Sequence, residues 1–219
     1  MKINVVESVL KANDAVAREN RRRMESAGVL ALNLMSAPGS GKTALLEKTI
    51  PALAPQRSAV LVGDLQTTRD AERLSGLAAE VTQINTGRGC HLSATEVSDG
   101  LDSLRLEHID FLFIENVGNM VCPAAHDLGE HRRVVLLSVA EGDDKVAKYP
   151  TLFRPADVVL LTKIDLAEVL GYSTRRVYDD LAQVNSRAPV IELSARSGEG
   201  LEAWLAWLRE QRQAVGKTV

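Results

Sequence analysis

Apolar residues in this chain of 219 residues gather in short runs, separated by longer segments with helical spacing. The strand-like runs span residues 29–35, 58–63, 81–85, 111–114, 134–139, 158–161 and 190–193. Most of them are unbroken rather than alternating, which is typical of strands covered on both faces, as in a parallel sheet. Segments with helical periodicity follow them at residues 42–53, 66–79, 91–107, 143–152, 171–187 and 199–215.

This regular alternation of strand and helix predicts the fold class. Right-handed crossovers would give an α/β protein with a doubly wound, mostly parallel sheet in three α/β/α layers, with its ligand at the carboxyl ends of the strands. Ahead of the first strand, residues 3–26 carry apolar positions with helical spacing and end near Gly28. We expect residues 1–219 to form a single domain, with residues 1–27 as an amphipathic helix packed on it.

Composition excludes several classes of protein. Hydrophobic residues make up 45% and charged residues 25%, a balance typical of a globular protein. The net charge of −3 gives no general attraction for a phosphate backbone, so we expect no nucleic-acid partner. Neither a secretion signal nor an apolar run of about 18 residues is present, which indicates a cytoplasmic protein with no membrane partner. Two cysteines are too few for a disulfide framework.

The strongest motif is SAPGSGKT at residues 36–43, which lies between a predicted strand and a predicted helix. Across Pro38, Gly39, Ser40 and Gly41, successive backbone N–H groups can converge on phosphate oxygens at the positive end of the next helix. Ser36 stands where the usual motif has its first glycine. A chance glycine-rich turn is the alternative, and the strand and helix on either side disfavour it.

Four side chains are candidates for the chemistry at this loop. Lys42 would supply a charge for the β- and γ-phosphates, and Thr43 would place its hydroxyl on Mg²⁺. Mg²⁺ prefers oxygen ligands, and Asp64 and Glu115 end the apolar runs AVLVGD and FLFIE at the same edge of the sheet. Either carboxylate could instead be an ordinary acid at the end of a strand.

The base is indicated by Thr162, Lys163 and Asp165, in the sequence TKID after another apolar run. This segment is placed like the Asn-Lys-x-Asp motif of GTPases. The carboxylate of Asp165 can accept both adjacent donors of guanine, a pair that adenine lacks. Thr162 replaces the expected asparagine, so the strength of the guanine preference stays open.

A second loop is predicted to contact the base. Ser194, Ala195 and Arg196 follow the last strand and resemble the loop whose backbone N–H contacts the guanine oxygen. The order of these segments after a phosphate loop favours GTP and GDP as ligands.

Sulfur and imidazole side chains follow two other strands. Cys90 and His91 come after one strand, and Cys122 leads away from another. Such ligands suit Ni²⁺, Zn²⁺ or Cu rather than Mg²⁺. Three ligands do not close a four-ligand structural site, so we expect an open site or one shared across a two-fold axis. The alternative is two buried thiols and a hydrogen-bonded histidine.

The remaining histidines are weaker candidates. His126 and His131 could be auxiliary ligands, although exposed histidines are commoner, and His108 has the sequence context of a surface residue. Cys122 follows Glu115 by seven residues. A shift that follows the γ-phosphate and its Mg²⁺ would therefore also move the thiol, which would couple metal affinity to the nucleotide.

Together the motifs SAPGSGKT, GDLQT, NTGRGCHL, ENVGNMVCP, EGDDKVAKYP, TKID and LSARSGEGL resemble the HypB family of nickel-incorporation GTPases, over nearly the whole chain. The resemblance implies a GTP-hydrolysing metallochaperone for [NiFe] hydrogenase maturation, with a P-loop GTPase fold. It implies a homodimer favoured by GTP, with Cys90, His91 and Cys122 at a metal site in the interface. It also implies maturation partner proteins and the precursor of the hydrogenase large subunit as partners.

Several features remain open beside this resemblance. The first cysteine is Cys90 and there is no histidine-rich stretch, so we expect no high-capacity nickel store. No glutamine or arginine in the sequence is recognisable as the residue that orients attacking water or stabilises the transferring phosphate, which predicts slow hydrolysis, of the order of 10⁻³ s⁻¹ or below. Lys145 and Lys148 could reach nucleotide or a partner subunit, or form a solvated turn.

Two other functions compete with this one. The first is a urease-type nickel maturation GTPase, which usually carries a Cys-Pro-His motif; here Cys90 precedes His91 and Cys122 precedes Pro123. The second is a non-catalytic metal-binding scaffold that nucleotide stabilises.

Overall fold

The computed structural model describes residues 5–65, 67–87 and 89–216, with the side chains of 5–9 and 216 outside the description. Its centre is one seven-stranded sheet in the order β3-β2-β4-β1-β5-β6-β7, and every pair of neighbours is parallel. The strands are β1 Leu30–Met35, β2 Ser58–Asp64, β3 Glu80–Asn85, β4 Phe111–Glu115, β5 Arg132–Ser138, β6 Val158–Thr162 and β7 Val190–Leu193.

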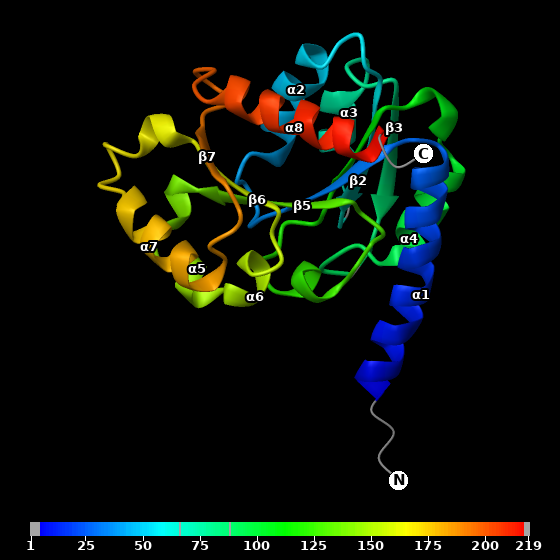
Figure 1. Ribbon diagram of the computed structural model, residues 1–219, viewed down its shortest axis with the longest axis horizontal. Helices are drawn as coiled ribbons and strands as arrows, with labels where there is room; N and C mark the ends of the chain where they lie inside the picture. The colour runs from blue at the N-terminus through cyan, green and yellow to red at the C-terminus, as the bar shows by residue number, and fades with distance from the viewer. Residues whose placement is uncertain (1–4, 66, 88, 217–219) are drawn as a thin grey trace.

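Helices cover both faces of the sheet (Figure 1). One layer consists of α2 Lys42–Ala52, α3 Arg69–Leu74 and α8 Leu201–Gly216. The other consists of α1 Val5–Ser26, α4 Ala94–Asp102, α5 Lys145–Lys148, α6 Pro150–Phe153 and α7 Thr174–Val184. Short 3₁₀ turns are η1 Leu106–His108, η2 Cys122–Ala125, η3 Val139–Glu141 and η4 Ile164–Leu166. The predicted three-layer, doubly wound α/β fold is confirmed.

The strand order places a switch point at β1. The chain runs from β1 outward to β3, returns to insert β4 between β2 and β1, and then continues outward on the other side through β5, β6 and β7. Loops that leave β1 and its two neighbours therefore diverge at the carboxyl edge. In doubly wound sheets the ligand binds at such a point.

The core consists of buried side chains on both faces of the sheet. On one face, Trp204 of α8 is fully buried, and its ring nitrogen donates a hydrogen bond to Thr49 Oγ1 of α2 over 3.0 Å. On the opposite face, Phe153 packs with the residues of β5 and β6. The central strands β1 and β4 have every residue buried, as the unbroken apolar runs predict.

The N-terminal helix α1 packs on α4 through its C-terminal half. Ala17 and Met24 are buried, and the Asn20 amide donates to the carbonyl oxygens of Ala94 and Leu128. The other half of α1 projects beyond the sheet in Figure 1. Ile3, which the sequence places on the apolar face, lies outside the described residues. Within the part of the chain that the structure describes, no helix has the length and apolar character needed to cross a membrane.

Some predicted helices are too long, and local chemistry explains two of the differences. The helix predicted at 91–107 begins only at Ala94, because Ser93 caps it and exchanges hydrogen bonds with Glu96. The segment predicted at 143–152 splits into α5 and α6 at Pro150, which has no N–H to continue a helix. Because α4 starts late, His91 lies in the same loop as Cys90 rather than in the helix.

Two glycines before α8 offer a test of local packing. Gly200 has φ +70°, and an added Cβ would lie 1.9 Å from the carbonyl oxygen of Glu192. Gly198 has φ +89° but open space around it. We expect Gly200→Ala to lower the free energy of unfolding by about 2–5 kcal/mol, since a left-handed backbone and an overlap both oppose it. Gly198→Ala, with the backbone cost alone, should lose about 1–2 kcal/mol in urea denaturation. Equal losses would contradict this account.

Candidate functional site

The phosphate loop at residues 36–43 joins β1 to α2 at the switch point. Gly41 takes a left-handed φ of 99° just before α2, and Lys42 and Thr43 are the first helical residues. Residues at the end of β6 hold this loop in place: the Thr162 hydroxyl donates to Ser40 O over 2.7 Å, and Lys163 Nζ donates to Gly39 O over 2.7 Å. Thr162 therefore orients the phosphate loop rather than pointing at a base.

Glu141 also supports the loop, and sequence reasoning missed its role. The Ser40 hydroxyl donates to Glu141 Oε1 over 2.6 Å, and the same oxygen accepts the Ser138 N–H. Glu141 lies in the motif EGDDKVAKYP, in which the sequence analysis considered only Lys145 and Lys148.

The ammonium groups of these two lysines lie near Asp144, at 3.9 Å for Lys145 and 2.5 Å for Lys148.

Two buried groups of opposite charge, Lys42 at the start of α2 and Glu115 at the end of β4, lie beside the phosphate loop. The Lys42 side chain is 8% exposed, and its Nζ donates to Ser36 Oγ over 3.1 Å. Burial lowers the pKa of Lys42, while the neighbouring Glu115 opposes that shift. Burial likewise raises the pKa of Glu115, and Lys42 opposes it. Desolvation therefore outweighs the mutual attraction for both groups, so an added anion and cation would stabilise the charged forms.

The oxygens around Thr43 fit the ligand preference of Mg²⁺. The Thr43 hydroxyl donates to Glu115 Oε1 over 2.7 Å, and among the described residues nothing bonds to the buried Glu115 Oε2. Asp64 is half-buried at the end of β2 and accepts a hydrogen bond from the Thr67 hydroxyl. A buried carboxylate oxygen without a partner is costly, and hard oxygens beside a phosphate loop suit a bound Mg²⁺.

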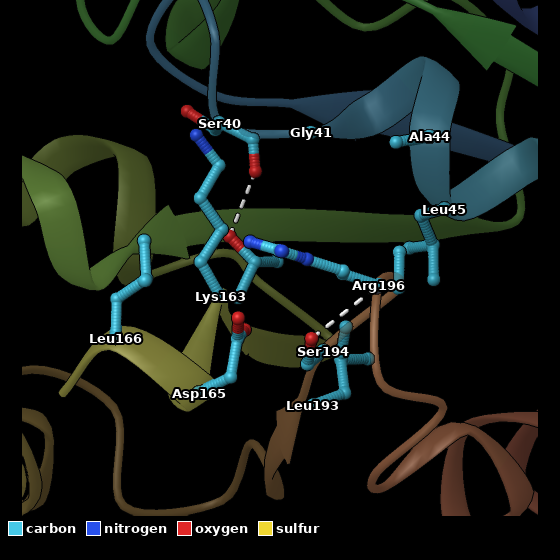
Figure 2. Close-up of a pocket in the computed structure, with 12 residues that line it drawn as sticks. Ser40, Gly41, Ala44, Leu45, Lys163, Asp165, Leu166, Leu193, Ser194 and Arg196 are labelled. Carbon is cyan, nitrogen blue, oxygen red and sulfur yellow. Dashed lines mark hydrogen bonds between the residues drawn. The ribbon is translucent and has the colours of Figure 1, made fainter.

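A pocket next to the phosphate loop matches the predicted base site (Figure 2). It encloses about 270 Å³, and its apolar wall includes Ala44, Leu45 and Leu193. Figure 2 shows the Asp165 carboxyl group pointing into this pocket, with the Arg196 side chain extending across it from the opposite loop. Both of these side chains are exposed.

The two loops that frame this pocket have defined backbones. Lys163 has φ 58°, an uncommon left-handed conformation for a residue with a side chain, which redirects the chain directly after β6. Ser194 Oγ accepts the backbone N–H groups of Arg196 and Ser197 over 3.2 and 3.1 Å. The Ala195 segment is thereby held in a tight turn at the edge of the pocket.

The structure brings Cys90, His91 and Cys122 together. One ligand atom from each lies within 4.8 Å of the others, and all three side chains are half-buried. Cys90 Sγ is 3.6 Å from His91 Nδ1. A hydrogen bond with the Cys122 thiol, and secondarily burial, raise the pKa of Cys90, while burial lowers the pKa of His91. Thiol and neutral imidazole groups at this spacing can ligate a soft or borderline metal ion once the thiols lose their protons.

The other histidines differ in position. The His126 ring packs against that of His91, tilted by 33° with the centroids 3.8 Å apart, and its Nδ1 contacts Cys122 O, so it borders the cluster. His131 Nδ1 accepts the N–H of Ala31 at the opposite end of the sheet, so His131 is not brought to the cluster. His108 is exposed before β4, as its sequence context predicts.

The loop that carries Cys122 also touches the phosphate loop. A Cβ on Gly118 would lie 2.8 Å from Pro38 Cα, so the two backbones are in contact. Asn119 Oδ1 accepts the N–H groups of Val121 and Cys122, and its amide contacts Cys122 Sγ at 3.5 Å. Asn119, which sequence reasoning overlooked, thus orients the thiol from a position beside the phosphate loop.

The fold and this site define a P-loop nucleotide-binding protein with a thiol and imidazole cluster next to its phosphate loop. Comparison with known proteins agrees. Residues 30–192 match the family model described as CobW/HypB/UreG, nucleotide-binding domain. The hydrogenase maturation factor HypB of Rhizobium leguminosarum bv. viciae is 50% identical over 94% of this chain and 69% of its own length.

Solved structures give the same result. The crystal structure of HypB from Helicobacter pylori in complex with nickel has a TM-score of 0.89 at 42% identity, covering 93% of this chain and 96% of that one. HypB from Archaeoglobus fulgidus has a TM-score of 0.87 at 39% identity, covering 93% of this chain and all of that one. The chain belongs to the HypB family of hydrogenase maturation factors, and the resemblance seen in its motifs is confirmed.

Proposed function

We propose that this chain is a GTP-hydrolysing metallochaperone that delivers Ni²⁺ during [NiFe] hydrogenase maturation. The observation that carries the proposal is the Cys90, His91 and Cys122 cluster, on loops that leave β3 and β4 at the edge where the phosphate loop lies. A family relative solved with nickel supports Ni²⁺ as the cargo. Zn²⁺ shares the same ligand preferences and is the competing occupant.

The nucleotide part of the proposal assigns a role to each element of the site. Backbone N–H groups of residues 38–41 and the Lys42 ammonium bind the phosphates, with Thr43, Asp64 and Glu115 around a Mg²⁺ that neutralises developing charge. The loops at Thr162–Asp165 and Ser194–Arg196 enclose guanine. The sequence contains no glutamine or arginine in a recognisable water-orienting motif, so hydrolysis is expected to be slow and to act as a switch.

Base selectivity is tested by Asp165→Asn. The carboxylate accepts two guanine donors, whereas an amide presents one acceptor and would favour the reversed donor pattern of xanthine. We expect the variant to bind GTP about 10²-fold or more weakly, since mismatched polar groups in a base site are strongly rejected, and to gain affinity for xanthosine triphosphate. Fluorescent-nucleotide competition measures both.

Glu168→Gln is the matched control for that experiment, because Glu168 is an exposed acid in the same loop that does not line the pocket. It should bind GTP like the parent protein. If ATP competed as well as GTP with the parent, or if Asp165→Asn left the preference unchanged, the guanine assignment would be wrong.

Assembly and location follow from the same proposal. A metal with three ligands from one chain has room for more, and a second copy could supply them across a two-fold axis, so we propose a homodimer favoured by GTP. Its partners would be other maturation proteins and the hydrogenase large-subunit precursor.

Two half-buried thiols near each other persist best in a reducing compartment, which favours the cytoplasm. Residues 1–219 would act as one GTPase domain, with residues 1–27 as a helix upon it.

Two other functions are less favoured. A urease-type maturation role would share the nucleotide chemistry, but the nearest cluster here is Cys90-His91 with Cys122 from a separate loop. A scaffold that uses nucleotide only for stability would not need the buried Lys42 and Glu115 pair at the phosphate loop. Steady phosphate release by the parent protein would exclude the scaffold.

A further inference from the structure

Asn116 directly follows Glu115, the carboxylate next to Thr43, and is 2% exposed. Its backbone N–H donates to Leu34 O over 3.1 Å, which ties it to the strand that enters the phosphate loop. The residue therefore has little freedom to move independently of β1 and β4.

The side chain of Asn116 makes three further bonds. Its Oδ1 accepts the N–H groups of Leu92 over 3.1 Å and of Val117 over 2.9 Å, and its amide donates to Asn33 Oδ1 over 3.2 Å. Leu92 is the residue immediately after His91. One side chain thus joins the segment that carries Cys90 and His91 to the segment that begins at Glu115 and leads to Cys122.

An ordinary buried asparagine also makes hydrogen bonds, and its loss would simply destabilise the protein. Asn20 is a buried asparagine of this structural kind: its amide donates to Ala94 O and Leu128 O, and it bonds neither to Leu92 nor to the segment from Glu115 to Cys122. Asn116 differs in what it joins. Its acceptor oxygen is shared between two loops that separately carry the metal ligands.

We propose that Asn116 is a positioning residue that couples the nucleotide site to the metal site, an inference that rests on the proposed function. When Mg²⁺ and a γ-phosphate occupy the loop, the hydroxyl of Thr43 turns toward the cation and releases Glu115 Oε1. The end of β4 then adjusts, and Asn116 carries the Leu92 N–H, and with it His91, along with the Cys122 loop. A network with two arrangements that both ligands bias gives such a coupling.

Linkage makes the proposal measurable in both directions. If the GTP state changes the Kd for Ni²⁺ by some factor, bound Ni²⁺ must change the Kd for the GTP analogue by the same factor. Coupling factors in proteins are typically about 5–150. Without the shared acceptor, the two loops should respond separately and the factor should approach one.

The experiment compares the full chain with Asn116→Ala. The Kd for Ni²⁺ is measured by titration calorimetry with Mg²⁺ and either GDP or a non-hydrolysable GTP analogue, and the Kd for each nucleotide is measured with and without Ni²⁺. We expect the parent protein to show a factor of about 5 or more between nucleotide states, and Asn116→Ala to show less than about 2. Each nucleotide should still bind the metal-free variant within a few-fold of the parent, because the Asn116 side chain bonds to Leu92, Val117 and Asn33 and to none of the predicted nucleotide contacts.

Asn20→Ala is the matched control, since it removes a buried amide of the same size and should lose stability while keeping the coupling factor. Should Asn116→Ala not fold, Asn116→Ser keeps a hydroxyl near the Val117 N–H but is too short to reach Leu92, and the same collapse of the factor is expected. A parent-like factor in the folded variant would overturn the role of Asn116 and leave the proposed function intact. Equal Ni²⁺ binding by the parent in both nucleotide states would also overturn the coupling alone, whereas a parent protein that binds no Ni²⁺ would overturn the proposed function as well.

Discussion

Lys42→Ala is expected to abolish phosphate release and to weaken GTP binding by roughly 30-fold or more. The ammonium is buried, bonds to Ser36 Oγ, and lies where the β- and γ-phosphates are predicted. Truncating one partner of a buried charge pair costs about 2–5 kcal/mol, and each 1.4 kcal/mol is tenfold in Kd. Hydrolysis should fall further than binding, because negative charge increases on the leaving phosphate in the transition state.

The measurement is a multiple-turnover assay of phosphate release, combined with nucleotide titration. Lys48→Ala is the matched control, since Lys48 lies on the same helix but is exposed to solvent. It should leave both quantities near those of the parent. Thermal unfolding must show that Lys42→Ala is folded. If the folded variant still released phosphate at the parent rate, the phosphate loop would not be the hydrolytic site.

The parts of the site that lie close together in sequence could be predicted from it. The phosphate loop consists of eight consecutive residues between a strand and a helix, so its phosphate-binding chemistry can be recognised from the sequence alone. Asp64 and Glu115 end apolar runs, and in the structure they are the last residues of β2 and β4. A parallel sheet brings such strand ends to one edge whatever the details of packing.

Contacts between distant segments could not be predicted in this way. Glu141 bonds to Ser40, and Asn116 bonds to Leu92, through pairs that no fixed spacing relates. The first contact depends on β5 lying beside β1, and the second on β4 lying beside β2, pairings that the order of elements along the chain leaves open. Polar residues in the loops after strands therefore looked alike in sequence. The buried ones became distinguishable only when the structure supplied their partners.

The predicted start of α4 was wrong because a local cap, rather than apolar spacing, sets where the helix begins. Apolar periodicity continues through residues 91–107, but the Ser93 cap and its bonds with Glu96 start the helix at Ala94. The capping pattern was present in the sequence, as Ser followed three residues later by Glu, and could have been used. Its consequence for the site is direct, because residues before the cap are free to form the loop that presents Cys90 and His91.

Cys122→Ser is expected to weaken Ni²⁺ binding by roughly 100-fold or more, and Cys90→Ser should behave similarly. Loss of a partner outside the ligand set typically costs 10–100-fold in metal affinity, and a direct ligand should cost at least as much. Serine preserves size and the contact with Asn119, so the change isolates the sulfur. Its hydroxyl is a harder ligand that stays protonated near neutral pH, unlike a thiol that releases its proton to the metal.

Calorimetric titration with Ni²⁺ and Zn²⁺ in a buffer that does not chelate metal measures the effect, and the proton release should fall in both variants. His108→Ala serves as the control, because that histidine is exposed before β4, at the opposite end of the sheet from the cluster. It should bind both metals like the parent. If both cysteine variants bound Ni²⁺ as tightly as the parent, the metal would lie elsewhere, and the protein would be a nucleotide hydrolase whose two thiols merely pack against each other.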